Sequence, residues 1–243
     1  MTAKKFYQIF FTVRRCLICE EMLSPERIDE AFCEKCQTGW NSDTLTACPE
    51  CFLPARECEC MPRSLKKAGA LTLRKLAFYM DEGDHKEVNS VIYWLKYKHN
   101  MRIANFVARE LLPALNTELD ALGLSNEDLV ITHVPRGKAS KISHGFDQSE
   151  MVCRQMSKQT KIKHLTLFKT SLSKDQQKDL NSKARMKHAN DTISMKKKTD
   201  VKGKYVLLFD DIVTSGASMA VCTRQLMKNG AKGVICLCLA SRG

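Results

Sequence analysis

Apolar and polar residues form two kinds of pattern in turn along most of the chain beyond residue 70. Short apolar runs that are typical of buried strands occur at 76–80, 129–135, 204–210 and 233–240. Between them, apolar residues recur every three or four positions, which predicts helices over 86–98, over 101–122, from Gln148 onward and over 217–229. Because strands that alternate with helices build parallel sheets, the expected fold class is α/β, with a mostly parallel sheet flanked by helices.

The run at 206–209 leads directly into two acids and a turn of small residues, in the sequence VLLFDDIVTSGAS (206–218). In α/β proteins ligands bind beyond the carboxyl ends of the strands, where this turn is expected to lie. Backbone N–H groups at the start of the next helix attract an anion such as phosphate, and Gly216 lets it approach closely. Asp210 and Asp211 would repel a phosphate, so we expect them to bind hydroxyl groups of the same molecule. A ribose 5-phosphate meets both conditions.

Two other interpretations of this motif explain less. An apolar strand followed by acids is also typical of nucleoside triphosphatases, but the chain has no GxxxxGK(S/T) run to hold a triphosphate. A capped helix after a strand would explain Thr214 or Ser215 but not the paired acids.

Eight of the twelve cysteines lie between positions 16 and 60. They form the close pairs Cys16–Cys19, Cys33–Cys36, Cys48–Cys51 and Cys58–Cys60. Two such pairs complete the tetrahedral thiolate set of a structural zinc site, and we expect the pairs to group in sequence order. The gap between Cys58 and Cys60 is tighter than usual, so one zinc ion or two are consistent with the sequence. A redox role for the pairs is the alternative.

The cysteine-rich segment has few large apolar side chains, so zinc would supply much of its folding energy. The sequence CMPRS (60–64) is typical of a boundary. We therefore expect a small double zinc-ribbon domain over 1–62 and a second domain over 63–243. Closed four-thiolate sites leave no position for a substrate, so the expected role of zinc is structural.

Positive charge is concentrated in one part of the chain. Residues 154–204 hold fifteen Lys/Arg against four Asp, a balance of +11, whereas residues 1–62 hold seven Lys/Arg against ten Asp/Glu, a balance of −3. The apolar pattern is weak from 169 to 204, which predicts a mobile loop and a short helix. Such a basic region attracts phosphate-rich partners, nucleic acid among them, and a solvated lysine-rich surface is the alternative.

No apolar run is long enough to span a membrane. The run FYQIFFTV (6–13) is too short for a signal peptide and is followed by Arg14 and Arg15 without a small-residue cleavage site. Because we interpret the cysteines as metal ligands and not as disulfide partners, we expect the protein to be cytoplasmic.

The motif at 206–218 resembles the phosphoribosyl pyrophosphate signature of type I phosphoribosyltransferases. More of the chain resembles one branch of these proteins, the ComF/GntX family, named for competence for natural transformation. The matching positions cover essentially the whole length: the N-terminal cysteine pairs, Leu95-Lys96-Tyr97, Val134-Pro135-Arg136, Gly145-Phe146 with Gln148, Gln177-x2-Leu180-x4-Arg185, Asp210–Ser218 and Gly230-Ala231.

The resemblance implies a type I phosphoribosyltransferase-like domain that binds phosphoribosyl pyrophosphate, or a related ribose phosphate, with Mg²⁺. The pyrophosphate loop would consist of Val134, Pro135, Arg136 and Gly137. Ribose and 5-phosphate would be held by Asp210, Asp211, Thr214, Ser215, Gly216, Ala217 and Ser218. The two acids are the candidate catalytic residues, and the segment 138–150 with the basic loop would close over the site.

The family's link to transformation implies work in DNA uptake, on single-stranded DNA and beside a ComFA-like helicase. A salvage enzyme that transfers phosphoribose to a nucleobase is the alternative, and turnover itself stays open. The chain departs from the family's usual Arg-Gly-Phe-Asn-Gln, because it has His144 and Asp147 in this motif, and His188 and Asp191 replace asparagines. The loss of a planar, always-charged donor at 144 would weaken a contact to pyrophosphate or to a nucleic-acid backbone.

The remaining cysteines and several histidines match no motif. Cys153 is isolated in a helical pattern and is expected to pack in the interior. Four histidines are interpreted as ordinary surface or packing residues: His85, His99, His133 and His164.

Overall fold

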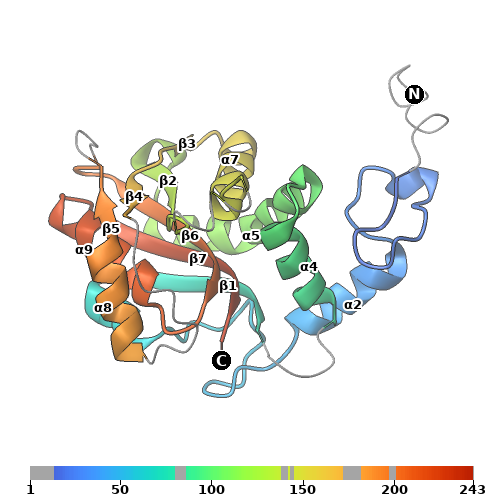
Figure 1. The fold of residues 1–243 in the computed structure, drawn as a ribbon, viewed down its shortest axis with the longest axis horizontal. Coiled ribbons are helices and arrows are strands. Elements are labelled where there is room, and N and C mark those ends of the chain that lie inside the picture. The colour runs from blue at the N-terminus through green and yellow to red at the C-terminus, as the bar shows by residue number, and fades with distance from the viewer. Residues whose placement is uncertain are drawn as a thin grey trace.

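A computed structural model describes residues 14–79, 86–137, 142, 145–171, 182–196 and 201–242 (Figure 1). Some of the sequence-based predictions lie outside these residues. They concern His85, residues 138–141, 143 and 144 of the segment expected to close over the site, Met80 at the end of a predicted strand, and the Gln177 and Leu180 positions of the family resemblance.

Five parallel strands form the central sheet of the described structure, in the order β1, β7, β6, β2, β3. Their bounds are β1 Thr72–Phe78, β2 Leu129–His133, β3 Lys163–His164, β6 Tyr205–Val213 and β7 Gly233–Ser241. A separate antiparallel pair consists of β4 (Phe168–Thr170) and β5 (Ile193–Met195). The predicted α/β fold with a mostly parallel sheet is confirmed, and β6 with its two acids lies in the middle of that sheet.

Helices cover both faces of the central sheet (Figure 1). One face is covered by α4 (Lys86–Tyr97), α5 (Met101–Leu122) and α7 (Gln148–Thr160), and the other by α3 (Arg63–Ala68), α8 (Ser182–Thr192) and α9 (Ala217–Lys228). A short 3₁₀ turn, η2 (Asn126–Asp128), precedes β2. Side chains of a strand point alternately to opposite faces, so Leu207 and Phe209 enter the first core whereas Val206 and Leu208 enter the second.

Most element boundaries agree with the sequence pattern. Helix α5 covers the predicted residues and ends at Gly123, whose positive φ of 61° stops it. Strand β1 begins at Thr72, four residues before the predicted start, and the basic stretch holds α8, as expected, together with the unpredicted β5. Strand β6 continues to Val213, so Asp210 and Asp211 lie inside the strand, where a strand end was expected.

The cysteine-rich segment, which contains η1 (Pro25–Arg27) and α2 (Glu34–Thr44), packs against α4 and α5. Phe32 and Trp40 are fully buried and meet the ring of Phe106 edge-on, with centroid distances of 4.6 and 5.1 Å. Trp40 Nε1 also donates a hydrogen bond to Glu110 Oε2 at 2.9 Å. One apolar core therefore crosses the boundary that the sequence predicts between residues 62 and 63.

Candidate functional site

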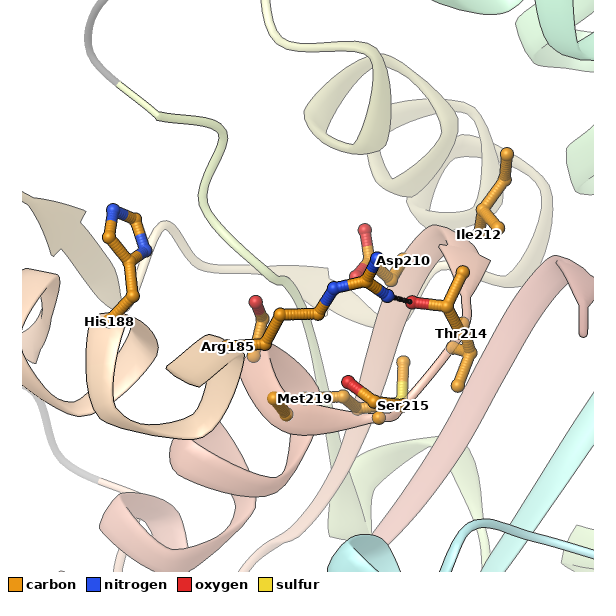
Figure 2. Close-up of a pocket in the computed structure, with 11 residues that line it drawn as sticks. Arg185, His188, Asp210, Ile212, Thr214, Ser215 and Met219 are labelled. Atoms are coloured by element: carbon orange, nitrogen blue, oxygen red, sulfur yellow. Dashed lines mark hydrogen bonds between the residues drawn. The ribbon is translucent and has the colours of Figure 1, made fainter. Parts of the chain in front are cut away.

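A cavity of about 150 Å³ lies where β6 ends and α9 begins (Figure 2). Its lining consists of Arg185, His188, Asp210, Ile212, Val213, Thr214, Ser215, Gly216, Ala217, Ser218 and Met219. Figure 2 shows Arg185 reaching from α8 toward the strand, where its Nη1 donates a hydrogen bond to Thr214 Oγ1 at 3.2 Å. The structure thus brings all five residues of the predicted phosphate turn, 214–218, to one cavity together with Asp210.

Among the described residues, no side chain accepts a hydrogen bond from the backbone N–H groups in the first turn of α9. Its N-cap is Gly216, which has no side-chain acceptor. At the start of α7, by contrast, Asp147 accepts hydrogen bonds from the backbone N–H groups of Ser149 and Glu150, at 3.1 and 3.3 Å. The first N–H groups of a helix have no partner within the helix, so an anion in the cavity would satisfy those of α9.

Gly216 is required by both backbone conformation and space. Its φ of 67° is in the left-handed region that disfavours other residues. An added Cβ would lie 3.0 Å from Ser64 Oγ and 3.2 Å from Pro62 Cβ. The Ser64 hydroxyl also donates a hydrogen bond to Ser215 O at 2.6 Å, so the start of α3 supports the turn from behind.

Asp210 is the acid that lines the cavity. Burial of its carboxyl, and then the neighbouring charge of Asp211, raise the pKa of Asp210 well above its ordinary value. Its Oδ1 accepts a hydrogen bond from Asp211 N at 3.0 Å. A carboxylate in such surroundings gains from any ligand that brings hydroxyl donors or a cation into the cavity.

Asp211 does not line the cavity and has protein partners of its own. Its Oδ2 accepts a hydrogen bond from Gln148 Nε2 at 2.9 Å and lies 3.9 Å from Lys96 Nζ. The ion pair gives Lys96 a function that its place in the sequence does not reveal. The two adjacent acids therefore have different surroundings: Asp210 faces the cavity, and Asp211 connects β6 to α4 and α7.

The predicted pyrophosphate loop, 134–137, follows β2 and lies beside β6, since Val134 N donates a hydrogen bond to Phe209 O at 2.9 Å. Arg136 N donates to Asp147 Oδ2 at 3.0 Å, and Arg136 Nη1 donates to Lys96 O at 3.3 Å. None of the four loop residues lines the 150 Å³ cavity. The loop and the phosphate turn are thus separate in this structure, although both follow central strands of the sheet.

The sequence-based site lacks Ile212, Val213 and Met219, which are neighbours of predicted residues along the chain, and also two cavity residues from a distant segment, Arg185 and His188. These two lie on α8, inside a stretch whose weak apolar pattern gives no sign that it returns to the sheet. The feature of the sequence that could have indicated Arg185 is the family resemblance, in which Arg185 is one of the matching positions.

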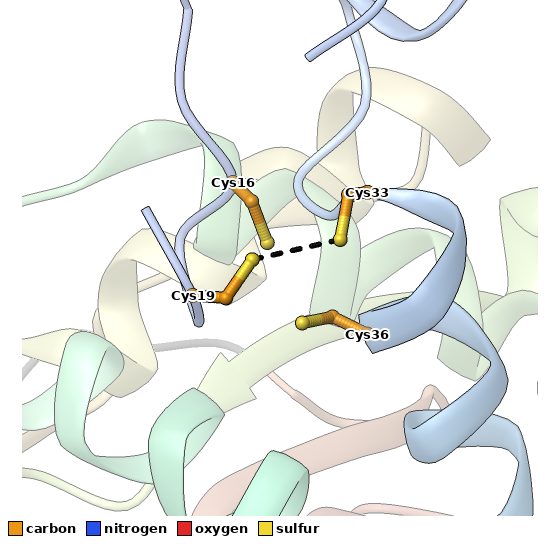
Figure 3. Close-up of side chains that lie close together, drawn as sticks. All are labelled: Cys16, Cys19, Cys33 and Cys36. Carbon is orange, nitrogen blue, oxygen red and sulfur yellow. Dashed lines mark hydrogen bonds between the residues drawn. The ribbon is translucent and has the colours of Figure 1, made fainter. Parts of the chain in front are cut away.

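The first four cysteines form one cluster, as predicted. Figure 3 shows the sulfurs of Cys16, Cys19, Cys33 and Cys36 pointing to a common centre. All four lie within 4.8 Å of one another, and the Cys19 and Cys33 sulfurs are 3.6 Å apart. Sulfurs bound about 2.3 Å from a tetrahedral zinc ion would be about 3.8 Å apart, so the set fits zinc. Although burial acts in the opposite direction, backbone hydrogen bonds lower the pKa of Cys16 to about 7, whereas burial raises the pKa of Cys19 to about 11.

The other four cysteines, Cys48, Cys51, Cys58 and Cys60, form a second cluster with sulfurs within the same 4.8 Å, so the tight gap does not prevent grouping. Lys75 of β1, only 1% exposed, donates hydrogen bonds to Cys58 Sγ at 3.2 Å and to the carbonyl oxygens of Cys58 and Cys60 at 3.0 and 2.8 Å. A buried ammonium group needs such partners. The second cluster is thereby attached to the central sheet.

Comparison with known protein families adds to this geometry. The family described as Phosphoribosyl transferase domain matches residues 101–243. The chain belongs to this family. The range that matches the phosphoribosyl transferase domain contains every residue that lines the cavity, as well as the loop at 134–137.

Curated relatives match most of the chain. DNA utilization protein YhgH of Escherichia coli (strain K12) is 26% identical over 213 residues, which cover 85% of this chain and 88% of that protein. The protein of the same name from Salmonella typhimurium (strain LT2) is 25% identical over 199 residues, which cover 80% and 84%. These matches confirm the resemblance to the ComF/GntX family.

Among solved structures, a purine phosphoribosyltransferase from Pyrococcus horikoshii is 20% identical, with a TM-score of 0.35 over 56% of this chain and 74% of that one. A hypoxanthine phosphoribosyltransferase from Staphylococcus aureus is 13% identical, with a TM-score of 0.36 over 60% and 68%. Within the described residues, no helix has the length and apolar character that a membrane span needs.

Proposed function

We propose that the cavity at the start of α9 binds the ribose and 5-phosphate of phosphoribosyl pyrophosphate or of a related ribose phosphate. The observation that carries the proposal is the uncapped first turn of α9 next to the half-buried carboxyl of Asp210. Backbone N–H groups and Arg185 would donate to phosphate oxygens, and Asp210 would accept hydrogen bonds from ribose hydroxyls. Membership of the phosphoribosyl transferase domain family supports this assignment.

The pyrophosphate would lie toward Val134, Pro135, Arg136 and Gly137. Carboxylate oxygens suit Mg²⁺, and Asp210 provides them at the cavity while Asp211 lies next to it in the strand. Mg²⁺ bound to the ligand would neutralise charge on the pyrophosphate. In this proposal Asp210 contacts the ribose, and Asp211, held by Gln148 and Lys96, fixes the position of this part of β6.

Calorimetric titration of the protein with Mg²⁺-phosphoribosyl pyrophosphate tests the proposal. Arg185→Ala removes a charged donor from the cavity, so we expect the affinity to fall about 10- to 100-fold. Lys187→Ala is the matched control, because Lys187 is an exposed cation of the same helix that does not line the cavity. Equal affinities for the Arg185 variant and the control would contradict the assignment of the cavity.

We also propose that the protein handles DNA, as the name of its curated relatives suggests for them. The charge of +11 over residues 154–204 supports a polyanionic partner. Single-stranded DNA and a ComFA-like helicase are the proposed partners, in the cytoplasm. Such a function uses the ribose phosphate site as a recognition site, and it does not require transfer of the phosphoribosyl group.

Anisotropy titrations with a fluorescent single-stranded oligonucleotide at several salt concentrations test DNA binding. Because binding would be mainly electrostatic, we expect the logarithm of the affinity to fall linearly with the logarithm of salt concentration. Affinity that does not change with salt would contradict it. The salvage alternative predicts instead that a free nucleobase and phosphoribosyl pyrophosphate yield a nucleotide and pyrophosphate.

The two cysteine clusters are proposed to hold one structural zinc ion each. Their closed four-thiolate sets leave no position for a substrate. The division into a zinc-ribbon domain over 1–62 and a phosphoribosyltransferase-like domain over 63–243 is likewise proposed as a description of sequence units, which share one core in space.

A further inference from the structure

Three side chains that match no motif meet between β2, β3 and α7. They are His133 at the end of β2, Cys153 in α7 and His164 in β3. One ligand atom of each lies within 4.8 Å of the others. His133 is 1% exposed and Cys153 is fully buried, whereas His164 is partly exposed. We propose that these three residues form a third metal site, which binds Zn²⁺ through two imidazole nitrogens and one thiolate.

The spacing of the two imidazoles fits a shared ion. His133 Nδ1 and His164 Nε2 are 3.3 Å apart, and the two rings are stacked with an interplanar angle of 26°. Nitrogens bound about 2.0–2.1 Å from a tetrahedral zinc ion would be about 3.3–3.4 Å apart. A direct hydrogen bond between the two rings has a similar length. The Cys153 thiol and the groups around the histidines must therefore distinguish a metal site from a hydrogen-bonded histidine pair.

The outer partner of His133 is typical of a metal ligand. Its second nitrogen, Nε2, lies 3.8 Å from Asp147 Oδ2, and both side chains are nearly inaccessible to solvent. A histidine that binds zinc commonly directs its other N–H to a carboxylate, which fixes the tautomer and the ring. Asp147 is itself held in place, because it caps α7 and accepts a hydrogen bond from Arg136 N.

Cys153 supplies the ligand that selects the metal. Its thiol donates a hydrogen bond to Thr132 O at 3.4 Å, one residue before His133, so it faces the end of β2 and would give up this proton on binding a metal ion. Thiolate with imidazole is a donor set for zinc and not for Mg²⁺ or Ca²⁺, which prefer oxygen ligands. The charge of a thiolate and of Asp147 together would balance a divalent ion, which removes the main cost of burying one.

An approach from solvent exists on the side of His164. A cavity of about 450 Å³ is lined by His164 and by residues of α7, among them Gln155 and Ser157. The fourth coordination position would face this side, because the other two ligands are buried. Lys158 and Lys163 also line the cavity, so an anionic fourth ligand, such as hydroxide, is favoured there.

The zinc content of the full-length protein tests the site. The protein is saturated with Zn²⁺, loosely bound metal is removed, and the zinc that remains is measured. The expected result is one zinc ion fewer per chain for His164→Gln than for the unchanged protein. His99→Gln is the control, because His99 is an exposed histidine outside the cluster. The difference of one equivalent does not depend on how many ions the cysteine clusters hold, nor on phosphoribosyl pyrophosphate binding.

Titration with Co²⁺ gives a second readout that does not rely on stability. Co²⁺ bound by two nitrogens and one sulfur absorbs differently from Co²⁺ bound by four sulfurs. We expect the mixed-ligand spectrum to be lost in Cys153→Ser while the four-sulfur spectrum remains. Equal zinc content in His164→Gln and His99→Gln, or cobalt spectra that show only four-sulfur sites, would overturn the proposal and leave a hydrogen-bonded histidine pair.

Discussion

At the scale of single residues, Asp210 shows a conflict between stability and ligand binding. Its carboxyl lies in the middle of the sheet, where burial and Asp211 disfavour the charged form. The folded protein therefore holds a proton on Asp210 more tightly than the unfolded chain does. It follows that the free energy of unfolding falls as pH rises from about 4, the ordinary pKa of an aspartate, through the raised pKa of Asp210.

Asp210→Asn should stabilise the protein at pH 8 by about 1–3 kcal/mol and weaken ribose phosphate binding. The amide is neutral at every pH and keeps an oxygen for the hydrogen bond from Asp211 N. Urea unfolding at pH 5 and pH 8 measures the effect, which should be smaller at pH 5. Asp211→Asn is the comparison, and it should not stabilise, because Gln148 and Lys96 already compensate that carboxylate. A loss of stability in Asp210→Asn at pH 8 would contradict the argument.

Gly216→Ala should weaken binding of Mg²⁺-phosphoribosyl pyrophosphate and cost about 1–3 kcal/mol of stability. The reason is that the added methyl group combines a strained φ with contacts to Ser64 and Pro62. Gly123→Ala is the matched control, since Gly123 has a similar φ of 61° but, in the described structure, its added Cβ would meet nothing within 4 Å. Thermal unfolding and calorimetry of both variants separate strain from crowding. Equal losses of stability and affinity in the two variants would mean that contacts of the added methyl group behind the turn have no effect.

The sequence predicts residues that are close together along the chain better than those that meet from afar. The turn at 214–218 and the cysteine pairs are local patterns, and the structure brings each of them together. Arg185 reaches the cavity from another helix, and His133 meets His164 through pairing of β2 with β3. No spacing rule along one chain reports such contacts, because they depend on the order of strands in the sheet.

At the scale of elements, α2 shows that the cysteine-rich segment is more than a metal-stabilised appendage. Trp40 and Phe32 bury their rings against Phe106 of α5. The sequence-based prediction of a small core in this segment considers only the segment's own apolar residues and not those that pack against it from other elements. The same limit applies to α8, which lacks a clear apolar face, and to β6, whose polar acids hide its last residues from a hydrophobicity pattern.

Trp40→Ala should lower the free energy of unfolding by about 3–5 kcal/mol in a single transition. The large loss is expected because the indole is fully buried and also bonded to Glu110. Tyr93→Ala is the control, as this ring of α4 is 49% exposed. Chemical unfolding followed by circular dichroism checks the prediction. Two separate transitions, of which only one responds to Trp40→Ala, would show that the segment folds independently.

At the scale of the whole molecule, the cysteine clusters connect to the sheet at two points. The first cluster lies in the main apolar core, and the second is bonded to Lys75 of β1. Removing zinc would thus leave a buried ammonium group next to unbound thiols, which costs stability unless the region opens.

Chelation of zinc should therefore increase amide hydrogen exchange in β1 as well as in the cysteine-rich segment. Exchange in α9, which packs against α3, α8 and the sheet, should change much less. Mass spectrometry of exchange in the protein before and after chelation measures both. Unchanged protection of β1 would show that the hydrogen bonds of Lys75 do not transmit the loss of metal.

The order of the strands in the sheet also determines when β1 can find its partner while the chain is being synthesised. Strand β7 follows the other strands of the central sheet in the sequence, yet it lies between β1 and β6. While a ribosome synthesises the chain, β1 is made early and its partner arrives late, so its edge stays unpaired in the meantime. The cysteine-rich segment emerges before β1, and two of its backbone carbonyl oxygens accept hydrogen bonds from Lys75 of that strand. Zinc loading during synthesis would then protect the strand from aggregation until β7 closes the sheet.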